Sequence, residues 1–168
     1  TSSGGIDLYE SMGAKVLGVD VGLHDILYGV QSYTISVGDV RAFKVERMLA
    51  DKILTILSEK RFRRTKDLYD FYILVTRFDF SYEELVYCIE HRNGYNEAVW
   101  DNIPFDELVL QKYLQAWNKL QLISSLTGVM LHKPEFYSVI ALFTSLTLRL
   151  KMKQQAESWD HCTLVWRD

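Results

Sequence analysis

Residues 49–74 read LADKILTILSEKRFRRTKDLYDFYIL, and this stretch decides how the chain folds. Apolar side chains recur in its first half at helical spacing, at Leu49, Ile53, Ile56 and Leu57. This spacing predicts an amphipathic helix over 46–58. A basic loop follows, and Thr65 can cap a second helix. The apolar face of that second helix carries Leu68, Phe71, Tyr72 and Val75.

The residues before this stretch alternate in polarity, as strands do. Strands are predicted over 14–21 (AKVLGVDV), 31–37 (QSYTISV) and 40–45 (VRAFKV), with glycine turns between them. After the stretch, the Ser81-x-x-Glu84 pattern is a capping box, which predicts a third helix up to about His91.

Two longer helices are predicted further along the chain. One covers 105–122, and the other covers 135–155 with Pro134 in its first turn. The tail carries Trp159 and Trp166, and two tryptophans predict a tail that docks on the body.

Together these elements predict an α+β fold, in which a partial sheet of two or three strands precedes a C-terminal helical bundle. We expect a β region over 1–45 and a helical domain over 46–168. Two or three strands with a helix on one side leave a sheet edge and a face uncovered. We therefore expect that a partner covers this β region or that the natural protein starts earlier.

The composition is that of ordinary globular proteins, with 48% apolar and 24% charged residues. A net charge of −3 gives no global indication of a nucleic acid or an anionic membrane as partner. No apolar run approaches the roughly 20 residues of a membrane span, so no membrane association is expected. Cys88 and Cys162 form neither a disulfide framework nor a zinc pattern, and are expected to be reduced thiols in a cytoplasmic protein.

Three groups of residues are candidates for chemistry, and the first is a pair of aspartates. Asp20 lies late in the predicted strand 14–21, and Asp25 lies in the turn after it. Carboxylates at a strand end and its following turn can hold a divalent metal in one cleft. Alternatively, Asp20 faces solvent on an edge strand and Asp25 is only a turn residue.

The second candidate is Lys52, which flanks the apolar stripe of the helix over 46–58. Its stem can follow the core while its ammonium reaches the border, where it could meet a phosphate. Ordinary snorkelling of a surface lysine explains the same position. Asp51 falls on the solvent side of that helix.

The third candidate is the segment 61–70, RFRRTKDLYD, in which Asp67 and Asp70 are neighbours on a helix. Arg64 and Lys66 stand beside them and could grip a nucleotide phosphate. The same residues could instead form surface ion pairs worth under about 1 kcal/mol each.

The stretch over 49–74 resembles the signature of the AbiEii nucleotidyltransferase toxin family. That family has an AEK or ADK helix, a loop with basic residues, and an R-x-KD-x-YD segment that opens the next helix. Ala50-Asp51-Lys52, Arg64, Lys66-Asp67 and Tyr69-Asp70 match it position by position. Two further segments are similar to it: TRFDF at 76–80 resembles SR-x-FDF, and DVGLHD at 20–25 resembles DIGFGD, with His24 at the usual glycine.

The resemblance implies an enzyme that transfers a nucleotide from a nucleoside triphosphate to an acceptor, with Mg²⁺. A tRNA end is an acceptor for relatives, and a separately encoded antitoxin protects the cell from some of them. Carried over, Asp20 and its neighbour Asp25 would serve the metal, and Asp67 would be the essential acid. Lys52 would contact the triphosphate, with Arg64 and Lys66 also on the nucleotide.

One part of the family pattern has no counterpart in this sequence. The first family motif is a Gly-Ser turn and an R-x-T-x-D-x-D strand, which supplies a serine and two metal carboxylates, and nothing here matches it. We expect that this motif lies before residue 1 or has been lost, and that the chain is inactive as it stands. One carboxylate of three should bind magnesium poorly.

Two functions therefore remain open. The first is nucleotidyl transfer by the complete protein, within a toxin–antitoxin or phage-defence system. The alternative is a non-catalytic helical module that docks an antitoxin or an RNA, and a weaker idea is a degenerate product without activity.

Overall fold

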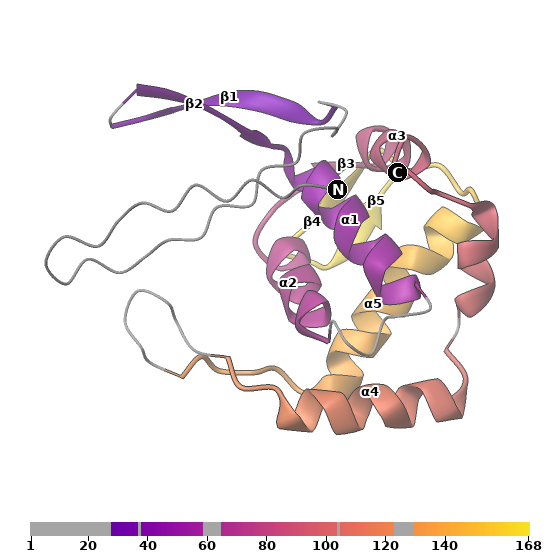
Figure 1. Ribbon diagram of the computed structural model, residues 1–168. Helices are drawn as coiled ribbons and strands as arrows, with labels where there is room; N and C mark the ends of the chain where they lie inside the picture. The colour runs from indigo at the N-terminus through magenta and orange to yellow at the C-terminus, as the bar shows by residue number, and fades with distance from the viewer. Residues whose placement is uncertain (1–27, 37, 59–64, 104, 123–129) are drawn as a thin grey trace, which may run out of the picture.

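The computed structural model of the chain describes residues 28–36, 38–58, 65–103, 105–122 and 130–168. Helices form most of the body, and a β-hairpin extends from it at the top of Figure 1. The hairpin consists of β1 (Val30–Ile35) and β2 (Gly38–Phe43), which pair antiparallel with Val30 opposite Phe43. Every residue of β2 is exposed. Gly38 has a φ of +129°, which favours glycine because it has no Cβ.

The helix α1 (Val45–Leu57) is the centre of the helical part and packs against α2 (Lys66–Val75) and α3 (Tyr82–Glu90). One face of α1 is removed from water, because its apolar residues recur at helical spacing. The buried apolar residues of α1 are Leu49, Ala50, Ile53, Ile56 and Leu57.

A short 3₁₀ helix, η2 (Glu97–Asn102), and two long helices complete the helical part, namely α4 (Glu107–Lys119) and α5 (Phe136–Lys151). Tyr113 of α4 is fully buried, and its hydroxyl donates to the carbonyl of Ile56 at 2.7 Å, which ties α4 to the end of α1. The ring of Phe143 on α5 lies 5.0 Å from that of Phe71 on α2, which joins these two helices.

A second, three-stranded sheet lies at the other end of the chain. β3 (Phe80–Ser81), β4 (Ser158–Asp160) and β5 (Val165–Arg167) are antiparallel, with β4 in the middle. Trp159 of β4 is fully buried, and its indole N–H donates to the carbonyl of Val75 at 2.8 Å. Its ring stacks on Phe80 at 5.9 Å between centroids. The prediction that the tail docks on the body is therefore confirmed.

Most predicted helices are present with small shifts of their ends. The helix predicted over 46–58 is α1. Ser81 caps α3, because its Oγ accepts from the backbone N–H of Glu84 at 3.4 Å, but the Ser81 N–H donates to Glu46 rather than to Glu84, so only half of the capping box forms. Thr65 precedes α2, but its side chain makes no capping hydrogen bond to that helix. Pro134 was expected in the first turn of the last helix, but it lies before the cap residue Glu135, whose carboxylate accepts from Ser138 N at 2.7 Å.

Two of the predicted strands are present in the structure. The strands expected over 31–37 and 40–45 are β1 and β2, whereas the strand expected over 14–21 lies outside the described residues. The sheet of β3, β4 and β5 was not expected. The mixed content of helices and strands agrees with an α+β fold, but the strands do not all precede the helices, because β4 and β5 follow α5. Within the described parts of the chain, no helix is both long and apolar enough to pass through a bilayer.

The buried indole of Trp159 gives a direct test of how the tail is attached. Trp159→Ala should lower the free energy of unfolding by about 3–5 kcal/mol, because it leaves a cavity and removes the donor to Val75. Val165→Ala is the matched control on the same sheet. The Val165 side chain is mostly exposed, so its change should stay within about 0.5 kcal/mol. Denaturant titration followed by circular dichroism measures both, and equal losses would contradict anchoring through the indole.

Candidate functional site

Lys52 and two carboxylates meet where α1 packs against α2. The Lys52 ammonium donates to Asp67 Oδ1 at 2.6 Å and to Asp70 Oδ2 at 2.8 Å. The Asp67 side chain is only 5% exposed, whereas those of Lys52 and Asp70 are about one-quarter exposed. The cluster therefore lies at the border of the α1–α2 contact, with Asp67 buried and with Lys52 and Asp70 partly open to water.

Local sequence positions these three groups. Lys52 borders the buried stripe of α1, so its stem packs on the core while its ammonium emerges beside α2. Asp67 lies in the first turn of α2, where a carboxylate suits the helix dipole. Asp70 follows three residues later, on the same side of the helix. The two aspartates therefore face the same lysine.

The pKa of Lys52 is raised in this cluster. Burial alone would lower the pKa of Lys52, but the hydrogen bonds from its ammonium to Asp67 and Asp70 outweigh burial and raise that pKa. The ammonium is thus fully protonated at neutral pH.

The predicted site residues are placed as follows. Lys52 and Asp67 are brought into direct contact. Lys66 lies at the rim, with its Nζ 4.0 Å from Asp70 Oδ1 and its side chain 68% exposed. Asp20, Asp25 and Arg64 lie outside the described residues, so their predicted roles stay predictions.

Carboxylate chemistry decides whether a magnesium ion fits here. Mg²⁺ takes oxygen ligands, and aspartate oxygens are suitable donors. Asp67 and Asp70 supply such oxygens, although both face the Lys52 ammonium. The donor set of the described site is therefore of the right kind for Mg²⁺.

Asp51 is more enclosed than the sequence predicts. Instead of facing only solvent, it bridges two arginines: its Oδ2 lies 3.4 Å from Arg47 Nε, and its Oδ1 pairs with Arg92. A cavity of about 660 Å³ adjoins this pair and is lined by the outer face of α1, the turn after α3, and η2. Two of its amides are already used, since Asn96 accepts from Ala98 N and Asn102 donates to the carbonyl of Leu57. The sequence did not reveal this cavity, because Arg92 lies far from Asp51 along the chain.

Comparison with known proteins adds one result to this geometry. The family model described as the nucleotidyl transferase AbiEii toxin of type IV toxin–antitoxin systems matches residues 9–159. No curated protein and no solved structure gives a significant match. The matched region is most of the chain and contains the whole Lys52, Asp67 and Asp70 cluster. The chain therefore belongs to the AbiEii nucleotidyl transferase family of toxins from type IV toxin–antitoxin systems.

Proposed function

We propose that this protein transfers a nucleotide from a nucleoside triphosphate to an acceptor, and that the Lys52, Asp67 and Asp70 cluster grips the triphosphate. The observation that carries this proposal is the Lys52 ammonium, which α1 presents beside α2 and which two carboxylates hold at 2.6 and 2.8 Å. A partly exposed, permanently charged amine at a fixed position suits the phosphate of an incoming nucleotide.

In nucleotidyl transfer, an acceptor oxygen attacks the α-phosphorus while the bond from that phosphorus to pyrophosphate breaks. The protein contributes mainly by positioning the reactants and stabilising negative charge. Lys52 would pair with phosphate oxygens and offset the charge of the departing pyrophosphate. Asp67, buried beneath it, would hold the ammonium in place, and we propose this as the role of the acid at this position.

Mg²⁺, when bound, supplies further positive charge to the phosphates. We assign its ligands to Asp20 and Asp25, in line with the sequence prediction. Arg64 and Lys66 would bind outer phosphates, and Lys66 is suited to this because its exposed ammonium stands beside Asp70.

The wider context remains part of the proposal. A tRNA end is our proposed acceptor, and a separately encoded antitoxin is the proposed protective partner. We also propose that residues 1–45 belong to the nucleotidyltransferase sheet and residues 46–168 to the helical domain.

The first prediction concerns activity. Lys52→Met and Asp67→Asn should each lower nucleotide transfer at least about 100-fold, because the first removes the cation that pairs with the phosphates and the second removes the carboxylate that holds this cation in place. The assay is transfer of labelled nucleotide by the protein expressed from its natural gene, and calorimetry with Mg²⁺ and each nucleoside triphosphate measures binding. Lys44→Met is the matched control, since Lys44 is also paired and one-third exposed, with Glu84 at 3.0 Å. Similar losses in the control, or full activity without Lys52, would refute the assignment.

The second prediction separates stability from activity. The pKa of Lys52 is higher in the folded protein than in the unfolded chain. The ion pairs of Lys52 therefore contribute their full stabilisation at pH values below the pKa of the unfolded chain, and this stabilisation disappears as the pH rises through the pKa of the folded protein. At pH 7, Lys52→Met should therefore cost about 1–3 kcal/mol of unfolding free energy, because the buried Asp67 loses its counter-charge.

Adding Asp67→Asn to Lys52→Met should recover part of this stability, because the buried one of the two carboxylates is then neutral, whereas Asp70 is about one-quarter exposed to water. Transfer should remain lost in the double variant. Thermal and denaturant unfolding give the stabilities, and Lys44→Met should cost under about 1 kcal/mol. Recovery of transfer together with stability would mean that the pair is only structural.

A further inference from the structure

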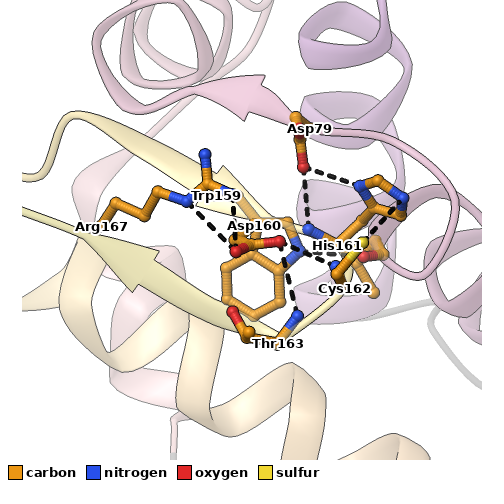
Figure 2. Close-up of polar contacts among 8 residues, drawn as sticks. Asp79, Trp159, Asp160, His161, Cys162, Thr163 and Arg167 are labelled. Atoms are coloured by element: carbon orange, nitrogen blue, oxygen red, sulfur yellow. Dashed lines mark hydrogen bonds and ion pairs between the residues drawn. The ribbon is translucent and has the colours of Figure 1, made fainter.

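Three side chains form a line at the turn between β4 and β5, away from the Lys52 cluster in the sequence. His161 Nδ1 lies 2.8 Å from Asp79 Oδ1, and His161 Nε2 lies 3.4 Å from Cys162 Sγ. Figure 2 shows the imidazole between the carboxylate and the thiol. A carboxylate, an imidazole and a thiol in this order resemble the groups that activate a nucleophile in enzymes.

The fold holds this line in position. β3 pairs with β4, so Asp79, which precedes β3, comes beside the residue that follows β4. The backbone N–H of His161 donates to the same Asp79 oxygen at 2.9 Å, so the histidine is held at two points. The turn begins two residues after the buried Trp159 and is therefore attached to the core.

A second carboxylate fixes the backbone of the turn. Asp160 Oδ1 accepts from the backbone N–H of Cys162 at 2.9 Å, and Asp160 Oδ2 pairs with Arg167 at 2.6 Å (Figure 2). The pKa of Asp160 lies well below its ordinary value, mainly because of the hydrogen bond from Arg167 and also because of that from Cys162 N. Asp160 therefore stays ionised and keeps the turn closed around neutral pH.

The hydrogen bond between His161 and Asp79 also selects the tautomer of the imidazole. The two donors of His161, first its backbone N–H and then its ring, lower the pKa of Asp79, so Asp79 is a carboxylate and accepts from Nδ1–H. With the proton on Nδ1, the other nitrogen, Nε2, is the acceptor in the neutral tautomer of the ring, and it faces the thiol. Asp79 thus orients His161, and His161 can take the proton of Cys162.

We propose that Cys162 is a nucleophilic thiol, with His161 as its base and Asp79 as a positioning residue, and that it is a site of S-thiolation by low-molecular-weight disulfides. In this step the thiol proton passes to His161 Nε2 while Sγ attacks one sulfur of the disulfide. The disulfide bond breaks, a mixed disulfide forms on Cys162, and the departing thiolate takes the proton from His161. Cys162 is exposed, so a small disulfide can reach it.

Two other reactions fit the cluster less well. Acyl transfer needs an N–H donor for the oxyanion, but the N–H of Cys162 is bonded to Asp160. A metal ion is suggested by the ligand atoms of Asp160, His161 and Cys162, which lie within 4.8 Å of one another. However, Asp160 already accepts from two backbone N–H groups and from Arg167, and a metal would have to displace these partners.

The chain contains its own control thiol. Cys88 is fully buried on α3, and burial raises its pKa to about 11. The two cysteines are the only ones in the sequence, so an aromatic disulfide reagent should give one fast equivalent from Cys162 and one slow equivalent from Cys88.

The experiment measures the rate of thiol release from the aromatic disulfide 5,5′-dithiobis(2-nitrobenzoate) between pH 5 and 9, with the full native chain. Cys162→Ser should remove the fast phase, and Cys88→Ser should leave it. His161→Gln should slow the fast phase about tenfold or more at pH 7 and shift its pH profile upward. Asp79→Asn should slow it less and also shift the profile, whereas His91→Gln, at an exposed histidine bonded to Tyr87 O, should change nothing.

Incubation with glutathione disulfide should add one glutathione by intact mass, on Cys162. Equal rates for both cysteines, a fast phase unchanged in His161→Gln, or a fast phase that appears only after treatment with a chelator would each overturn the proposal. The last result would identify a metal site instead. Melting temperatures of the variants check that slower rates do not follow from unfolding. If Asp79 only orients His161, the Asp79→Asn variant should regain the fast rate at high pH.

Discussion

The contact between the Lys52 ammonium and the carboxylates of Asp67 and Asp70 constrains how α1 and α2 can pack. Taking a charge partly out of water costs free energy, and only a well-placed counter-charge offsets that cost. Here two oxygens lie at 2.6 and 2.8 Å from one ammonium, beside a stripe in which Leu49 and Leu68 are fully buried. A shift of α2 by one turn would separate these charges. The ion pair therefore adds a directional contact to the apolar packing that sets the register of α1 and α2.

The other end of α2 is held by a different interaction. The indole of Trp159 donates to the carbonyl of Val75, a residue 84 positions earlier in the sequence, and so satisfies a helix-end carbonyl that would otherwise be buried without a partner. A helix of 10 residues is about 15 Å long, so α2 is fixed at its first turn by Lys52 and at its last turn by the tail. The thiol of Cys162 follows Trp159 closely and is attached to this second anchor. The proposed phosphate site and the proposed thiol site therefore share one helix as support.

Local signals account for what the sequence predicted well. The stripe of α1, the cap at Ser81 and the strands of the hairpin are all encoded within a few neighbouring residues, and each was found close to its predicted place. Helical periodicity also placed Lys52 at the flank of its helix and Asp67 in the first turn of the next, but it did not predict the contact between them. The sheet of β3, β4 and β5 was not predicted, because its strands are two or three residues long and β3 pairs with the distant β4. The bridge from Asp51 to Arg92 and the line from Asp79 to Cys162 likewise join residues that are distant in the sequence.

Charge balance supports a nucleotide as the ligand of the α1–α2 site. The two carboxylates beside the Lys52 ammonium repel a triphosphate, so binding of a triphosphate there would require further positive charge nearby. The sequence provides such charge next to Asp67, in the run KRFRRTK at 60–66, and the family to which the chain belongs transfers nucleotides. If the cluster binds a triphosphate as proposed, the two aspartates would also hold the Lys52 amine extended until a phosphate with its accompanying cation competes for it. A lysine without such partners would lose side-chain entropy each time it bound.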